Sequence, residues 1–575
     1  MTSSPPPAEA GPAPSRLRRL RAALVPTLRA LLLASLAHLG IALLATTPLL
    51  LSPTTRLIGH PDVDVWNHAW GPWWFWSCLS QGELPLATRY LAAPDGGRLF
   101  FPDLLGALVG APLEPLAGVV LTWNLVVLFH VGLASVAGRA LARAVGAGKR
   151  ESWLGAAALA CSPYLLSEVH NGISEAMALG APVLALAALI SALKHGGWAR
   201  WLGLGLAAGL TLAGTAYYSL GVAFVAVPLV ADALVRQAGR RREILGGMLG
   251  AVAVAVLLGG PVLAAAWWTV QTDALVFRPP HTSLQELEPQ LIHNAVDPRS
   301  FFWPGDFQSA QLPGEAFRHT SYLGFVVIFL ALRSRARTLL AASLVPLVLS
   351  LGPWLWVHGS WLTVGGLRVC LPYRLLFELL PRSTLGHPQR VGMPGIALIV
   401  ALAARGLGGL RPRVAVGLAV GAVLELLLLS PAPWPVARTP TIDLAVPRAV
   451  RRLVSERGAG PRAIVLDLPA DVGHTMRASQ HLFYQSLHGF ALPYKPDVRA
   501  STSSLGGLPA FRWLTGLDPT LPDSGLRRLS SSGVVVVVVH RDLMDEQERA
   551  RVEAALVDWG GPPEVVGAAD LFVTP

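Results

Sequence analysis

Long apolar runs constrain this chain of 575 residues more than any other feature. Charged residues make up only 14% of the sequence, against about 25% in ordinary soluble proteins, which excludes a water-soluble globule. A helix that crosses a bilayer needs about 20 mostly apolar residues. By that criterion the sequence predicts a mainly α-helical membrane protein with about eleven transmembrane helices, over residues 27–51, 119–143, 151–168, 174–194, 199–214, 216–236, 244–269, 321–333, 336–353, 391–406 and 412–430.

The basic residues support this assignment, because they cluster in every second connection between the apolar runs. The clusters fall at 16–21, 143–150, 194–200, 236–242, 333–337 and 405–413. Loops rich in arginine and lysine face the cytoplasm. A nucleic-acid site would instead need its basic side chains on one surface, so we expect no nucleic-acid partner despite the net charge of +11.

This orientation places every large loop on the external side. We expect a disordered cytoplasmic N-terminus over 1–26, a multi-span domain over 27–430, and external loops at 52–118, 270–320 and 354–390. In the external tail, 431–575, strand-like segments at 464–469 and 533–540 and a helical segment at 545–559 predict a small α/β domain. The composition, poor in lysine and rich in alanine, glycine and arginine, is typical of a bacterial cytoplasmic membrane protein from a GC-rich genome.

The three cysteines do not indicate a metal centre or a reactive thiol. Cys78, Cys161 and Cys370 form no CxxC pair and no zinc-like cluster. Cys78 and Cys370 both fall on the predicted external side, where a disulfide can form, but spacing does not show whether they pair.

The first external loop is rich in tryptophan. Trp66, Trp70, Trp73 and Trp74 follow the spacing of one helical face. We expect interfacial helices here, with that face in the headgroup layer. In the alternative interpretation, one or two of these rings stack against a sugar.

Acidic residues at the mouth of the first span need another explanation. Asp62 and Asp64 precede Asn67 and His68 by about one helical turn. Desolvation at this position raises the pKa of a carboxylate toward that of a useful general base. The structural alternative is that Asp64 only caps the helix that begins at Val65.

Several motifs carry a resemblance to a known family. They are GHPDVDVWNHAW at 59–70, AAPDGGRLFFP at 92–102, CSPY at 161–164 followed by His170, TAYYS at 215–219, FFWPG at 301–305, SYLG at 321–324, LGPW at 351–354 and HPQR at 387–390. With its long acidic first loop, many spans and external tail, the chain resembles the GT-C superfamily of polyprenyl-phosphate-sugar-dependent glycosyltransferases. It is closest in style to YfhO-like bacterial proteins.

The resemblance implies a chemistry for the first-loop acids. Asp64, or Asp62, would be the general base that takes a proton from the acceptor hydroxyl as it attacks the anomeric carbon, with inversion. A site facing outward has no nucleotide sugars, so the donor would be a sugar on a polyprenyl phosphate in the membrane. The acceptor would be an envelope glycan, lipid or protein. The resemblance implies no cofactor, and it leaves open whether a divalent metal ion is required.

A departing lipid phosphate needs cations near the headgroup. The candidates are Arg278, Arg374, His387 and Arg390, and the best is the HPQR motif, since it leads directly into the tenth predicted span. Ordinary interfacial snorkelling is the alternative for Arg390. Further candidate substrate contacts are Asn67, His68, Trp70, Tyr217 and Tyr218; the tyrosines could equally be interface-belt residues. Glu168, His170 and Glu175 share a short external connection that is also a candidate.

A different class of function also fits the scaffold, namely a non-catalytic lipid or polysaccharide transporter or an envelope assembly factor. Transporters usually carry ionisable groups near the bilayer midplane. Glu425 is the main such group within the predicted spans. Acids concentrated at the external mouth favour the transferase.

Overall fold

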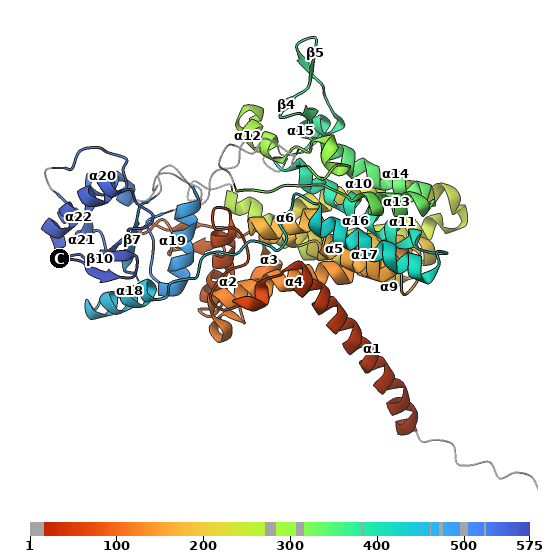
Figure 1. The fold of residues 1–575 in the computed structure, drawn as a ribbon, viewed down its shortest axis with the longest axis horizontal. Helices are drawn as coiled ribbons and strands as arrows, with labels where there is room; N and C mark the ends of the chain where they lie inside the picture. Colours follow the sequence, from red (N-terminus) through yellow and green to blue (C-terminus); the bar gives the residue numbers. More distant parts are fainter. Residues whose placement is uncertain are drawn as a thin grey trace, which may run out of the picture.

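The computed structural model describes residues 16–270, 283–305, 307, 316–380, 385–460, 462–470, 475–494, 504–522 and 525–575. Figure 1 shows a helical bundle at one end of the molecule and a smaller unit containing a sheet at the other. The helices of the bundle are α1 (Arg16–Ala45), α4 (Glu114–Val145), α5 (Ser152–Ala160), α6 (Pro163–Asn171), α7 (Ser174–Met177), α8 (Gly180–His195), α9 (Trp198–Gly214), α10 (Ala216–Arg236), α11 (Arg241–Val270), α13 (Phe325–Arg333), α14 (Arg337–Leu349), α16 (Pro388–Gly406) and α17 (Pro412–Leu428).

Each of the eleven predicted runs contains helix, but their lengths differ. Within the described residues, four helices are long and apolar enough to cross a membrane: Glu114–Val145, Ser174–His195, Ala216–Arg236 and Ala238–Thr269. Leu257 on α11 and Leu32 on α1 are 76% and 60% exposed, as lipid-facing side chains would be. The mainly helical membrane architecture is therefore present, and the count of eleven spans stays a prediction.

Several helix boundaries differ from the sequence prediction. Helix α1 begins at Arg16, so residues 16–26 are helical where a disordered terminus was expected; residues 1–15 lie outside the described part. The run 151–168 is divided into α5 and α6, because Ser162 caps α6 through the Leu165 N–H and Pro163 occupies its first turn.

The loops between the bundle helices carry short elements. They are η1 (Leu49–Leu51), α2 (Val65–Leu79), β1 (Ala87–Thr88), β2 (Gly97–Arg98), α3 (Leu104–Gly110), η2 (Ala238–Arg240), α12 (Leu284–Asn294), η3 (Pro298–Phe301), β3 (Trp356–Val357), β4 (Ser360–Trp361), β5 (Thr363–Val364), β6 (Leu367–Arg368), η4 (Pro372–Leu375) and α15 (Leu376–Leu379). Cys78 is buried on α2 and Cys370 is exposed near η4; both are free thiols, so the two do not pair.

The tail folds around a four-stranded sheet of order β7-β8-β10-β9. Its elements are α18 (Ala445–Glu456), β7 (Ile464–Leu468), α19 (Thr475–His488), η6 (Ser504–Gly507), α20 (Pro509–Leu514), α21 (Arg527–Ser531), β8 (Val534–His540), α22 (Glu546–Gly560), β9 (Glu564–Val566) and β10 (Ala569–Val573). Strands β7 and β8 are parallel, whereas β10 is antiparallel to both β8 and β9. The valine run therefore forms a central strand, as an uninterrupted apolar run of this length predicts.

The tryptophan face of α2 lies inside the protein and not in a headgroup layer. Trp66, Trp70, Trp73 and Trp74 are 3%, 1%, 8% and 0% exposed. Helix α19 of the tail covers part of this face, with the Phe483 ring 5.3 Å from Trp66. The prediction of membrane anchoring is wrong for these side chains, because the periodicity identified an apolar face but not the partner that buries it.

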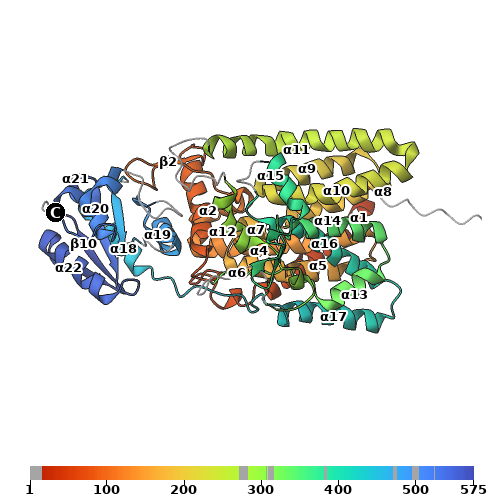
Figure 2. The same ribbon diagram turned by 90° about the horizontal axis from the view of Figure 1, so that it is seen from above.

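The first loop and the tail are joined by further contacts. Beside the β1–β2 hairpin, the Ala92 N–H donates to the Tyr494 carbonyl (2.8 Å) and the Leu492 N–H donates to the Tyr90 carbonyl (2.8 Å). Near the start of the loop, Ile58 pairs with Arg438 in an antiparallel bridge. Figure 2 shows α2 and α19 between the bundle and the sheet of the tail. We call this set of contacts the loop–tail clasp.

Candidate active site

The start of the first loop is fixed on helix α4. The Asn124 side chain accepts from the Ile58 N–H (2.9 Å) and donates to the carbonyls of Pro53 and Arg56 (both 2.8 Å). The Trp123 Nε1–H donates to the Ile58 carbonyl at 2.8 Å. The backbone groups of the buried Ile58 would otherwise be unsatisfied, so these contacts set where residues 59–64 emerge.

The loop then packs against the end of α6. The His60 N–H donates to the His170 carbonyl (2.7 Å), and the Asp64 N–H donates to the Asn171 carbonyl (3.2 Å). Gly172 has φ 72°, and a Cβ there would lie 2.6 Å from the Val65 Cα. Only glycine fits this crossing, which brings the DVD motif against the α6–α7 connection.

The two acids of the motif have different surroundings. The Asp62 side chain is 78% exposed and lies 3.8 Å from His60. Asp64 is partly buried at the N-terminus of α2, and its side chain makes no capping hydrogen bond to that helix. Burial lowers the pKa of His60; Asp62 opposes that shift and Arg318 adds to it, which favours a neutral imidazole beside the acids.

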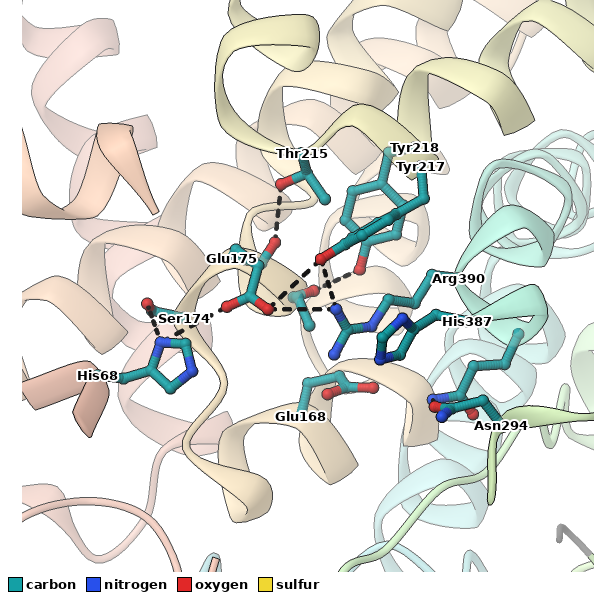
Figure 3. Close-up of polar contacts among 12 residues, drawn as sticks. His68, Glu168, Ser174, Glu175, Thr215, Tyr217, Tyr218, Asn294, His387 and Arg390 are labelled. Carbon is teal, nitrogen blue, oxygen red and sulfur yellow. Dashed lines mark hydrogen bonds and ion pairs between the residues drawn. The ribbon is translucent and has the colours of Figure 1, made fainter. Parts of the chain in front are cut away.

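A buried ion pair lies next to this crossing, at the start of α16 (Figure 3). Arg390 is 4% exposed, and its Nη1 donates to Glu175 Oε1 (3.2 Å) and to the Tyr217 hydroxyl (2.7 Å). His68 on α2 places its Nδ1 3.5 Å from Glu175 Oε2 and 3.0 Å from Ser174 Oγ. Side chains from α2, α7, α10 and α16 therefore meet around one carboxylate.

The remaining predicted contacts divide into near and distant ones. The His387 ring lies 5.8 Å from the Tyr217 ring in a tilted arrangement, and burial together with the charge of Arg390 lowers the pKa of His387 well below the ordinary value. Tyr218 is fully buried, and its hydroxyl is hydrogen-bonded to the Tyr164 hydroxyl and to the Ala176 carbonyl. These contacts give Tyr218 a structural role. Arg374 lies apart from the cluster, paired with Glu378 at the surface, and Arg278 falls outside the described residues.

Asn67 and Trp70 lie on α2, as His68 does, but they differ in their hydrogen bonding. The Trp70 ring is 1% exposed, and its Nε1–H donates to Gln485 Oε1 at 2.9 Å, so the ring is committed to the clasp. The Asn67 Oδ1 is buried and has no hydrogen-bond partner.

Several other buried polar atoms around the ion pair also lack a hydrogen-bond partner. They are Glu168 Oε2, Glu175 Oε2, His170 Nδ1, His319 Nε2 and Arg390 Nε. Each unsatisfied buried group costs about 1–3 kcal/mol. A concentration of such atoms at one place is typical of a site built for a polar occupant.

The irregular segment 316–324 completes this region, and sequence reasoning assigned no role to its first part, residues 316–320. Asn171 holds the segment by donating to the Arg318 carbonyl (2.7 Å) and accepting from the Arg318 N–H (2.9 Å). His319 lies 3.8 Å from Glu168 and 2.9 Å from the Gln389 amide. Gln389 belongs to the HPQR motif, but no pattern in the sequence linked that motif to residue 319.

An apolar groove of about 400 Å³ opens farther along α16. Its lining includes Phe301, Leu323, Leu344, Leu347 and Ile399. Ile399 is nine residues after Arg390, which is about 13 Å along a helix axis and two and a half turns around it. The groove therefore lies on the opposite face of α16 from Arg390.

Side chains that could bind a metal ion come together in the tail. Among the described residues, the group of three histidine or carboxylate ligands that come close enough to hold one ion is Asp467, His481 and His540, which lies in the tail. Around Arg390, the carboxylates of Glu168 and Glu175 each have an oxygen atom without a hydrogen-bond partner.

No known family model and no curated protein matches the sequence. Solved structures do match. The archaeal oligosaccharyltransferase AglB from Archaeoglobus fulgidus, in complex with an inhibitory peptide and a dolichol-phosphate, has a TM-score of 0.50 at 14% identity, over 91% of this chain and 71% of that chain. The arabinofuranosyltransferase AftD from Mycobacteria has a TM-score of 0.52 at 16% identity, over 95% of this chain.

These neighbours are GT-C glycosyltransferases, and the chain has the GT-C fold that its motifs predicted. The chain spans 40% of the length of AftD. The apo form of the Archaeoglobus fulgidus oligosaccharyltransferase agrees, with a TM-score of 0.51 at 13% identity over 92% of this chain and 71% of that chain. The narrower resemblance to YfhO-like proteins stays a prediction.

Proposed function

We propose that this chain is an inverting glycosyltransferase. It moves a sugar from a polyprenyl-phosphate donor to an envelope glycan, lipid or protein on the external face of the bacterial cytoplasmic membrane. The observation that carries the proposal is the buried guanidinium of Arg390, which keeps an unpartnered N–H and pairs with Glu175, the carboxylate that His68 of the first loop also approaches.

The phosphate of the donor fits the buried cation, because Arg390 offers a fork of N–H donors suited to a phosphate oxygen. The AglB structure was solved with a dolichol-phosphate and an inhibitory peptide, which supports a lipid-linked donor for this fold. Because the leaving group is already an anion, it needs positive charge near it and no general acid.

In the proposed step, Asp64 accepts the proton of the acceptor hydroxyl. The hydroxyl oxygen forms a bond to the anomeric carbon, the bond from that carbon to the phosphate oxygen breaks, and the polyprenyl phosphate leaves with the electron pair. Asp64 is favoured over Asp62 because it is the more enclosed carboxylate, on the helix that also carries His68.

The test compares Asp64→Asn with Asp62→Asn in a strain whose envelope glycan depends on this protein. We expect Asp64→Asn to lower transfer by about 10²–10⁴-fold, the contribution of a general base, while Asp62→Asn retains most of it. Mass spectrometry of lipid extracts would show the donor accumulating, and immunoblots of membranes would control for abundance.

Two outcomes change the conclusion. Loss of transfer with Asp62→Asn alone would move the base to Asp62. Normal glycan from both variants at normal abundance would contradict the transferase and leave the assembly-factor reading.

A further inference from the structure

Three titratable side chains that the proposed transfer does not use meet in the tail. Asp467 lies near the end of β7, His540 ends β8, and His481 lies on α19. They are 2%, 5% and 0% exposed. One ligand atom from each lies within 4.8 Å of the other two.

The position within the sheet is one that binds ligands in other α/β folds. Strands β7 and β8 are parallel neighbours, so their carboxyl ends lie at the same edge of the sheet. Ligands in such sheets bind beyond the carboxyl ends of the strands. Helix α19 is the next element after β7, and it contributes His481.

Hydrogen bonding within the group leaves it incompletely satisfied. Asp467 Oδ1 accepts from His540 Nε2 at 2.8 Å, but Asp467 Oδ2 is buried and has no hydrogen-bond partner. A buried carboxylate oxygen in that state is costly unless a cation or donor is present. The Nε2 atom of His488, another buried histidine on α19, also has no partner.

The tautomer of His481 suits a metal ligand. Its Nε2–H donates to the Pro469 carbonyl at 2.8 Å, which assigns the ring lone pair to Nδ1. A backbone carbonyl behind the ring is the usual outer partner of a histidine that binds a metal.

We propose that Asp467, His481 and His540 form a binding site for a divalent transition-metal ion such as Zn²⁺, separate from the region around Arg390. Two imidazoles and one carboxylate are a ligand set that Zn²⁺ takes, with a fourth position filled by water or another ligand. The ion would take the place of the hydrogen bond between Asp467 and His540. Because α19 also packs on α2, the ion would tie the helix behind the first loop to the sheet of the tail.

The experiment uses the full chain purified in detergent, stripped with a chelator and reloaded with Zn²⁺ or Co²⁺. We expect one ion per chain by elemental analysis, and visible absorption bands of low-symmetry Co²⁺. Asp467→Asn and His540→Gln should each lower the affinity for Zn²⁺ by more than about 100-fold, since even outer partners of metal ligands contribute 10–100-fold.

His130→Gln is the matched control. His130 is also buried and lies 3.2 Å from a buried carboxylate, that of Asp103, but this pair has no third ligand among the described residues. The control should retain the tightly bound ion. Glu168→Gln should retain it too, which separates this site from any cation held near Arg390.

X-ray absorption of the Zn²⁺-loaded wild-type protein gives a readout that does not depend on variants folding, and two imidazole ligands are expected. Wild-type protein that binds no ion, or an ion whose binding is unchanged by Asp467→Asn and His540→Gln, would overturn the proposal. Loss of the metal with unchanged glycan transfer would leave the proposed transferase intact, because neither argument depends on the other.

Discussion

A buried arginine determines what the candidate site can bind. Taking a guanidinium out of water is costly unless it is paired, and Arg390 is paired on only one side, with Glu175 and Tyr217. Its Nε faces no acceptor. The ion pair thus holds the cation in place while part of its hydrogen-bonding capacity stays available for an anion.

This arrangement predicts that replacing Glu175 alone lowers the free energy of unfolding more than replacing Glu175 and Arg390 together. Glu175→Gln should lower the free energy of unfolding by about 3–5 kcal/mol, because it leaves a buried charge uncompensated. Combining it with Arg390→Gln should restore part of that loss. Thermal unfolding of the detergent-purified variants, arranged as a double-mutant cycle, measures the coupling.

Glu378→Gln supplies the matched control, since the Arg374–Glu378 pair is 31% and 59% exposed and joins neighbouring turns. Such pairs contribute about 0.3–0.5 kcal/mol. Equal losses from Glu175→Gln and Glu378→Gln would contradict the account of Arg390 as a charge held by burial and pairing.

At this scale the sequence identified Arg390 and His387 but not the pairing of Arg390 with Glu175. The motif HPQR shows a cation at a helix start, whereas the carboxylate that pairs with it lies 215 residues away. The tryptophan face illustrates the same limit: Trp70 bonds Gln485, at a separation of 415 residues. Periodicity reveals an apolar face, and only the folded chain reveals what covers it.

Among the helices, α13 is unusual because an acid on a neighbouring helix caps it. Glu425 of α17 accepts from the Phe325 N–H (2.5 Å), the Val326 N–H (2.9 Å) and the Tyr322 hydroxyl (2.7 Å). A carboxylate at a helix N-terminus satisfies orphan donors and complements the helix dipole. This explains the main ionisable residue within the predicted spans without a transport role.

Glu425→Gln should therefore destabilise the bundle by about 1–3 kcal/mol, because an amide NH₂ replaces one of the two oxygens that accept from backbone N–H groups. Glu425→Ala should cost more. Thermal midpoints in detergent give the order, and Leu424→Ala, at a side chain 48% exposed on the same helix, should change little. Glycan transfer per folded molecule should stay near that of the wild type; its loss at full stability would favour the transporter interpretation.

Apolar run length predicted where helices occur but not where they break. The signal for the division between α5 and α6 was present in Ser162-Pro163, a capping residue followed by proline. The late start of α13, at Phe325, had no such signal, since its cap comes from Glu425 about 100 residues later.

For the molecule as a whole, the loop–tail clasp constrains the topology. The first loop and the tail share backbone hydrogen bonds and a common apolar core, so both lie on the same side of the membrane. An even number of crossings must separate them, and the ten spans predicted between them satisfy this requirement. The loop–tail clasp thus supports an even number of spans between the first loop and the tail, independently of the arginine pattern.

A reporter fused after Pro575 should accordingly signal from the external side, and so should a cysteine-reactive label at Cys370, the exposed thiol near η4. The label must not enter the cell, and permeabilised cells give the total. A cytoplasmic signal from the fusion would mean that both the tail and the acidic first loop face inward, which would remove the case for a lipid-linked donor.

The clasp also has a consequence for biosynthesis. Helix α2, which starts at the proposed base, completes the burial of Trp66 and Trp70 only when α19, made some 415 residues later, packs onto it. A chain whose synthesis stops before α19 would leave these rings partly exposed, where proteases and chaperones could recognise them.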